Sequence, residues 1–268
     1  MKHDTSWGKV ADWYDEYLDS DDSYQKAVIL PNLLRILDPK KSDTMLDIAC
    51  GQGFFTERFA RNASKVFASD ISGELVGKAQ RRFAGEGIKN ASFYVKPAHD
   101  LSFLPAGSID KATCVLAAQN IKELDGMFKE AARAITKGGK LVLVLNHPSF
   151  RVPQGSDWHF NNDVARKEHD PNVGKQGRVV YQYLNEAMIK IDMNPGTKQG
   201  EGKKQFTISY HRPLQVFVKW LTKHGFAVTR IEEWSSHKKS QPGPKAKAED
   251  AARKEIPLFM CIEATLIN

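Results

Sequence analysis

The sequence predicts an α/β fold with a parallel sheet, and three observations support it. Short apolar segments alternate with helix-like segments over the first half of the 268-residue chain, as they do in βαβ units. One apolar segment ends in Gly51-Gln52-Gly53, and a helix-like segment follows directly. The next apolar segment ends in a lone carboxylate, Asp70, 17 residues after Gly53. A glycine turn and a carboxylate at the ends of successive strands are typical of a sheet that binds an adenosine.

The expected elements follow in order along the chain. Two helices come first, at 7–19 and 24–37, and Asp38-Pro39 ends the second. Five strands are expected, at 44–49, 66–69, 91–95, 112–116 and 141–145. Their helices are expected at 54–62, 74–83 and 122–136, the last one stopping at Lys137-Gly138-Gly139. The strand at 112–116 is continuously apolar, so we expect it to be buried on both faces.

The alternation breaks at His147. Residues 147–212 are polar and rich in aromatics, with strand-like pieces at 179–184, 188–192 and 205–209, and they are too many for a connecting loop. We expect a small β-rich lid inserted after the fifth strand. The rest of the chain predicts a helix at 214–224 capped by Gly225, a strand at 226–231, a basic loop at 237–254 and a last strand at 258–266. The two late strands would form an antiparallel hairpin at the sheet edge.

Composition limits the class of protein. With 41% apolar residues the chain can bury one large core, or a core plus a cap. Its three cysteines are far apart and odd in number, so they form neither a disulfide framework nor a metal motif and favour a reducing compartment. The N-terminus lacks an apolar signal core, and no apolar run approaches membrane-spanning length. We therefore expect a soluble, cytoplasmic protein with no membrane partner and no metal, as a monomer or homodimer.

The positive charge lies mostly in the second half of the chain. The net charge of +7 divides into +1 over residues 1–150 and +6 over residues 151–268. A basic half can attract nucleic acid or an anionic small substrate, and it can equally be a solvated surface. In the segment 237–254, acidic residues are interleaved with basic ones and no aromatic residue is present for base stacking, which favours a solvated loop.

The residues around the glycine turn disfavour a dinucleotide cofactor. A dinucleotide fingerprint requires G-x-G-x-x-G/A, but Thr56 occupies its third position here. Asp47 lies upstream at the strand end, where a carboxylate repels a pyrophosphate and accepts from a cationic amino group. Both residues disfavour a nicotinamide-linked oxidoreductase.

This run resembles the first motif of the class I S-adenosylmethionine (SAM)-dependent methyltransferases, which is Asp, an apolar residue and then Gly-Cys-Gly-x-Gly. Asp47, Cys50, Gly51 and Gly53 match the motif, and Ala49 stands where its first glycine is usual. Alanine is tolerable there if its φ angle is negative.

The resemblance is specific over residues 44–146 and implies a Rossmann-like seven-stranded sheet of order 3-2-1-4-5-7-6 with the last strand antiparallel. It also implies four regions of the chain. These are an N-terminal helical cover (1–43), a SAM-binding core (44–146), an inserted substrate lid (147–212), and a last helix with a C-terminal hairpin that completes the sheet (213–268).

The resemblance also implies where SAM binds. Asp47, Cys50 and the glycine turn would approach the methionine moiety. Asp70 would bind the ribose hydroxyls, with a helix N-cap as the alternative role, and Ile71 would pack on the adenine.

Two further strand ends would complete the cofactor site. Ala98 stands where the family's adenine-reading Asp is usual, so that contact would come from the backbone, from His99 or from Asp100. After the fourth strand, Leu116 would line the cleft beneath the sulfonium, and Gln119 would orient the methyl acceptor or cap the following helix.

The run at 7–18 resembles the opening of the small-molecule methyltransferases of quinone and biotin biosynthesis, in which two helices fold over the cofactor. Tyr14 or Tyr24 would then supply a hydroxyl that reaches the cofactor. The alternative is that both are packing aromatics with a solvated hydroxyl.

Three histidines and two arginines are candidates for the substrate side. His147 and His211 are candidate general bases, because a neutral imidazole can take a proton near pH 7, and His159 is a candidate substrate contact in the lid. The alternative for each is a loop histidine that shapes the cleft. Arg151 and Arg212 are candidate clamps for an acidic substrate.

The sequence therefore predicts a SAM-dependent methyltransferase that methylates O, N or C of a small molecule by in-line transfer and releases S-adenosylhomocysteine (SAH). Two alternatives keep the cofactor. One is an RNA methyltransferase that uses the basic half, and the other is a non-catalytic SAM-binding protein.

Overall fold

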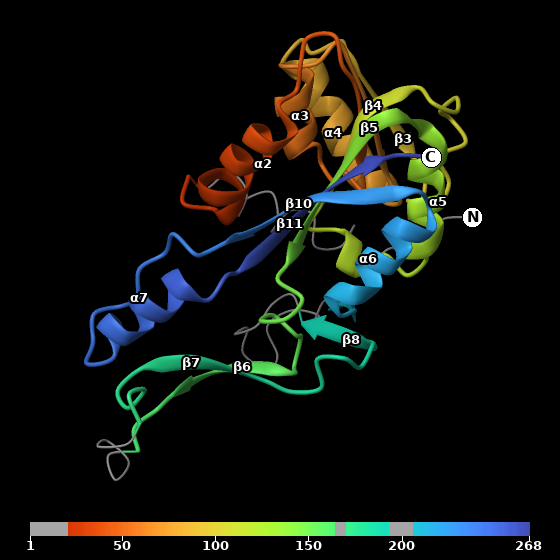
Figure 1. Cartoon of the computed structure of the whole chain (residues 1–268). Helices are drawn as coiled ribbons and strands as arrows, with labels where there is room; N and C mark the ends of the chain where they lie inside the picture. The colour runs from red at the N-terminus through yellow and green to blue at the C-terminus, as the bar shows by residue number, and fades with distance from the viewer. Residues whose placement is uncertain (1–20, 164–169, 193–205) are drawn as a thin grey trace.

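The structure, a computed structural model, describes residues 21–163, 170–192 and 206–268. It is built on a seven-stranded sheet of order β3-β2-β1-β4-β5-β11-β10 (Figure 1). The strands are β1 (Thr44–Ile48), β2 (Lys65–Asp70), β3 (Ala91–Val95), β4 (Ile109–Val115), β5 (Ile135–Asn146), β10 (Phe226–Trp234) and β11 (Phe259–Leu266). The first five are parallel, and β11 runs antiparallel to both β5 and β10. The predicted order 3-2-1-4-5-7-6 is therefore confirmed.

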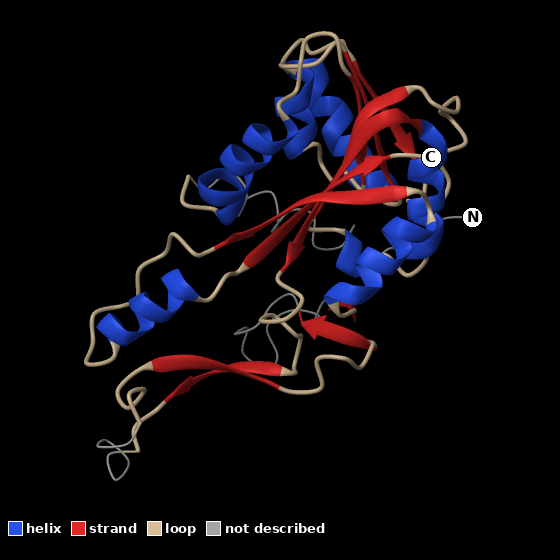
Figure 2. Ribbon diagram, in the orientation of Figure 1, coloured by secondary structure: helices blue, strands red, loops and turns tan. Residues whose placement is uncertain are grey.

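Helices cover both faces of the sheet (Figure 2). In chain order they are η2 (Gln25–Ile29), α2 (Leu30–Leu37), α3 (Phe54–Ala60), α4 (Gly73–Gly85), η3 (Ala118–Asn120), α5 (Leu124–Ala134), α6 (Leu214–Lys223) and α7 (Ala246–Glu255). No helix in the described ranges combines the length and apolar composition needed to cross a membrane.

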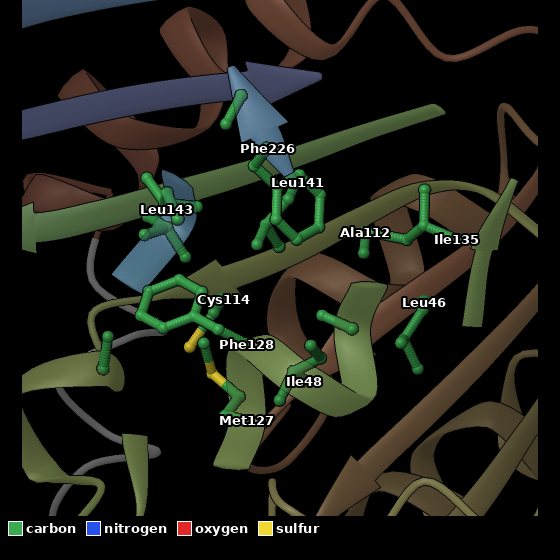
Figure 3. Close-up of a cluster of buried hydrophobic side chains, with 14 of the residues drawn as sticks. Leu46, Ile48, Ala112, Cys114, Met127, Phe128, Ile135, Leu141, Leu143 and Phe226 are labelled. Carbon is green, nitrogen blue, oxygen red and sulfur yellow. The ribbon is translucent and has the colours of Figure 1, made fainter. Parts of the chain in front are cut away.

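The alternation of side chains along the strands divides the core in two. In β1, Leu46 and Ile48 pack with α5 and α6, whereas Met45 packs on the other face with α2 and α3. In β5, Leu143 joins the first cluster, which Figure 3 shows, and Val144 joins the second. Because both faces are buried, the strands read as continuous apolar runs in the sequence.

Residues 147–212 form two separate antiparallel hairpins within the described ranges. One pairs β6 (Ser156–Phe160) with β7 (Gln176–Val180), and the other pairs β8 (Ala187–Asp192) with β9 (Phe206–His211). The strand pieces predicted at 188–192 and 205–209 match the second hairpin. The piece at 179–184 overlaps only the end of β7. No predicted strand corresponds to β6, because three of its five residues are polar.

Two sequence predictions about secondary structure are wrong. The segment 237–254 is not only a loop, since α7 occupies its second half beside β7 (Figure 1). Its Ala, Lys and Glu residues favour a helix. The prediction of a loop rested on the charges of the segment and not on this propensity. The helix before β5 ends at Ala134 rather than at the glycines, because Ile135 already pairs with Ile109 of β4.

Ala49 has a left-handed backbone, with φ of +57°, and not the negative φ that would suit alanine. Because a Cβ is strained in this region, we expect Ala49→Gly to raise the free energy of unfolding by about 1 kcal/mol. Ala117 has φ of −116° and serves as the control. Ala117→Gly should lower the free energy of unfolding by about 0.5–1 kcal/mol. Urea unfolding measures both, and a loss of stability in Ala49→Gly would contradict the assigned strain.

Candidate functional site

The glycine turn joins the carboxyl ends of β1 and β2. Cys50 N–H donates to Ser69 O of β2 at 3.0 Å, and Gly53, with φ of +83°, begins α3. A Cβ on Gly53 would lie 3.1 Å from a ring carbon of Phe83, so only glycine permits this packing of the turn on α4. At Gly51, by contrast, an added Cβ would meet no atom within 4 Å. The turn is therefore tightly packed on one side and open on the other.

Asp47 is a buried carboxylate with no cationic partner among the residues that the structure describes. It accepts hydrogen bonds from the hydroxyls of Thr56 (2.6 Å) and Thr113 (3.0 Å). Burial raises the pKa of Asp47 to about 6, and these two hydrogen bonds offset the effect only in part. A cation placed beside this carboxylate would remove much of the cost of its burial.

Asp70 holds the open side of the turn. Its Oδ2 accepts from Gly51 N–H at 2.9 Å, its Oδ1 accepts from Ser72 N–H at 2.8 Å, and burial raises its pKa. The alternative N-cap role for Asp70 is wrong, because the Ser72 hydroxyl caps α4 by accepting from Leu75 N–H at 3.3 Å. Ile71 is 37% exposed, so an apolar side chain lies open beside this carboxylate.

The residues at this turn fit a cationic adenosine derivative such as SAM. Space is open beside Gly51, and the buried carboxylate of Asp47 lacks a counter-charge within the described ranges. Two buried polar atoms, Gln52 Oε1 and Ser69 Oγ, also have no hydrogen-bond partner among the described residues. A ligand with amino and hydroxyl groups would satisfy such atoms.

The other described residues predicted for the cofactor site contact neighbouring parts of the protein. Ala98 packs against the core cluster that contains α5, and His99 packs on Gly126 of that helix. Asp100 pairs with Lys96 at 2.6 Å, which holds its pKa near 2. Tyr24 directs its hydroxyl to Ser236 Oγ at 2.9 Å. Tyr14 lies outside the described residues.

A second strained turn follows β4. Leu116 has φ of +53°, and its carbonyl accepts from Gln119 Nε2 at 2.7 Å. Strained residues other than glycine concentrate at functional sites. Because β4 is the neighbour of β1, the strained turns at Ala49 and Leu116 lie along the same edge of the sheet.

A cavity lies at this edge, beyond the end of β5 and against β9 and α6. It is where open α/β sheets bind ligands, at the carboxyl ends of the strands. Four residues predicted for the substrate or for catalysis line it: Gln119, Arg151, His211 and Arg212. Leu145 and Phe217 give the cavity apolar walls.

The histidines differ in how their ring nitrogens are used. His211 Nε2–H donates to Tyr183 O at 2.7 Å, so Nδ1 is the ring nitrogen that this bond does not engage. His147 lines no part of the cavity. Its Nε2 pairs with Glu233 at 2.6 Å, its Nδ1 accepts from Ser149 N–H at 3.2 Å, and burial lowers its pKa. His159 is exposed on β6 and is also absent from the cavity.

Arg212 has a structural role in this geometry. Its guanidinium donates to the carbonyls of Ile121 (2.9 Å) and Lys122 (3.1 Å) and so fixes the loop after η3 against β9. It also lies 4.9 Å from the ring centre of Tyr210. Arg212 is thus occupied by the protein's own acceptors, unlike Arg151.

Some site residues were not found from the sequence. Thr56 was interpreted only as a replacement for a third glycine, but its hydroxyl holds Asp47. Thr113 does the same from the neighbouring strand β4. Ser209 and Tyr210 line the cavity, and their only sequence signal was their position next to His211.

Comparison with known proteins agrees with this geometry. Residues 46–143 match the methyltransferase domain family. Over 99 residues the chain is 32% identical to a ubiquinone biosynthesis O-methyltransferase of Xanthomonas oryzae, a match that covers 37% of this chain and 41% of that protein. It is 29% identical, over 74% of this chain and 81% of the other, to a ubiquinone/menaquinone biosynthesis C-methyltransferase of Allorhizobium ampelinum.

A solved structure of similar fold is an S-adenosylmethionine-dependent methyltransferase from Mesorhizobium loti. It superposes with a TM-score of 0.67 at 22% identity, over 91% of this chain and 100% of that one.

Proposed function

We propose that this chain, whose residues 46–143 match the methyltransferase domain family, transfers the methyl group of SAM to a small-molecule acceptor bound in the cavity. One observation carries the proposal. The open glycine turn with its two buried carboxylates and the cavity with its polar lining lie along the same edge of the sheet. SAM bound at the glycine turn would then have its methyl acceptor in the cavity at the same edge of the sheet.

When bound, SAM supplies the reactive methyl carbon and the leaving sulfide, so the protein has to orient the reactants and exclude water. Asp47 would hold the amino group of SAM, and Asp70 would hold the ribose hydroxyls. Because Asp70 already binds Gly51 N–H, the same carboxylate would fix both the turn and the ribose.

His211 is the proposed general base for a hydroxyl or amine acceptor. Its Nε2–H is fixed on Tyr183 O and the residue lines the cavity, so the Nδ1 lone pair would take the acceptor's proton as the new bond to carbon forms. His147 is less suited, because its Nδ1 lone pair is engaged by Ser149 N–H.

A small acceptor is supported by the position of the cavity between β5, β9 and α6 and by its apolar walls, Leu145 and Phe217. Two relatives are named as methyltransferases of quinone biosynthesis, which also favours a small acceptor. An RNA acceptor has less support, since Lys238 pairs with Asp22, and Glu249 and Glu255 interrupt the cations of α7.

Calorimetric titration with SAH tests the cofactor site. We expect binding to the wild type, and a loss of at least about tenfold in affinity for Asp70→Ala, since a charged hydrogen-bond partner is removed. Asp110→Ala is a matched control, because Asp110 Oδ2 likewise accepts a backbone N–H, that of Thr44 at 2.8 Å, but at the opposite end of β1. No binding of SAH, or equal losses in both variants, would contradict the proposal.

A further inference from the structure

Two residues that line the cavity each carry a buried polar atom that no group in the described part of the chain satisfies. Gln119 Oε1 and Arg151 Nε are both buried and have no hydrogen-bond partner among the described residues. Both residues line the same cavity. One atom is an acceptor and the other is a donor on a cation, so each needs a different group of a ligand.

Arg151 differs from the two other arginines around it. Arg178 donates to Phe150 O at 2.8 Å and to Ser156 Oγ at 2.9 Å, and Arg212 donates to carbonyls of the loop after η3. Arg151 and Arg178 lie 5.3 and 5.1 Å from the ring of Trp158. This stacking orients the guanidinium of Arg151 but satisfies none of its N–H groups.

The charges around Arg151 do not neutralise it. Burial, with added repulsion from Arg178 and Arg253, lowers the pKa of Arg151 to about 10, against an opposing contribution from Tyr24. Among the charged groups of the described ranges, Arg151 forms no ion pair with a carboxylate. A partly buried cation without a counter-ion is costly unless a ligand supplies one.

We propose that the methyl acceptor carries a carboxylate and that Arg151 binds it, which extends the function proposed above by naming the substrate class. One unpaired guanidinium matches the single charge of a carboxylate better than the double charge of a phosphate ester. Leu145, Pro148 and Phe217 surround an apolar body. Gln119 Oε1 then accepts from a hydroxyl or amine of the acceptor, because Gln119 Nε2 is held on Leu116 O.

Two isosteric probes test this assignment, 4-fluorobenzoate and 4-fluorobenzamide, followed by fluorine NMR titration with and without saturating SAH. In the wild type we expect the benzoate to bind at least about tenfold more tightly than the benzamide, since a charge-assisted hydrogen bond is gained. Arg151→Gln should remove this preference, and Arg151→Lys should retain part of it. Arg81→Gln makes the same charge change at an exposed site on α4 and should change nothing.

The outcomes distinguish failure of the carboxylate assignment from failure of the proposed methyltransferase function. Equal binding of both probes, binding of neither, or a preference that survives Arg151→Gln would overturn the carboxylate assignment even if SAH binds. Tighter binding of 4-fluorophenyl phosphate than of the benzoate would assign the site to a phosphate ester instead and overturn it as well. Failure of SAH to bind would overturn the proposed function, while a benzoate preference that depends on Arg151 would still support the anion site.

Discussion

Asp47→Asn is expected to weaken SAH binding by about 100-fold or more, because it removes one partner of a buried charge pair. Asparagine keeps the shape of the side chain and an acceptor for the hydroxyl of Thr56. The variant therefore tests the charge rather than the packing. Calorimetry with SAH measures the change.

The same substitution should stabilise the protein without ligand, and the effect depends on pH. The pKa of Asp47 is raised to about 6 by burial, from 3.8 in the unfolded chain. Stability contributed by a raised carboxyl pKa is fully present below pH 3.8 and is lost as the pH rises through 6. The loss amounts to about 3 kcal/mol. Asp47→Asn does not titrate, so its stability relative to the wild type should increase between pH 4 and pH 8.

Thermal unfolding at pH 4, 6 and 8, with and without SAH, measures this difference. Asp110→Asn controls for the loss of a carboxylate at the far end of the sheet. Tighter SAH binding in Asp47→Asn, or a stability difference that is constant with pH, would show that Asp47 is not a buried charge kept for a cation.

His211→Ala should lower kcat by about 10²–10⁴-fold for a hydroxyl or amine acceptor, since general-base catalysis contributes that much. SAH affinity should stay unchanged, because His211 lies in the cavity and not at the glycine turn. Release of SAH during methylation of an acceptor that the wild type uses measures the rate. Added imidazole should restore part of it, which a purely structural histidine would not show.

His147→Ala is the comparison for that experiment. We expect it to lower stability, because His147 bridges Glu233 and Ser149 N–H, and to leave kcat of the folded protein nearly unchanged. A larger fall in kcat for His147→Ala than for His211→Ala would reverse the assignment of the base.

The core of the fold was predictable because its signals are local. Buried parallel strands give apolar runs, and the ends of β1, β2 and β3 were predicted to within one residue. The hairpins after β5 were harder to predict, since β6 has only five residues, three of them polar, and none of them is fully buried. In α7 the run of charged residues favours a solvated loop, but the helix propensity of its alanines decides the structure.

The site was predictable only where one residue type implies one role. Asp47, Asp70 and the glycines have such roles, and the structure gathers them at one turn. Arg151 and Arg212 were equivalent in the sequence, and only the hydrogen bonds of Arg212 to loop carbonyls separate them. His147 and His211 were likewise equivalent until their partners were known, because contacts distant in the sequence decide which nitrogen is available.

A crystal structure of the protein grown with SAH tests the central claim most directly. It is predicted to place the ribose hydroxyls at Asp70, the amino group at Asp47 beside the open space at Gly51, and the sulfur toward the cavity lined by Gln119 and His211. SAH bound elsewhere on the chain, or an unoccupied glycine turn at millimolar SAH, would contradict it.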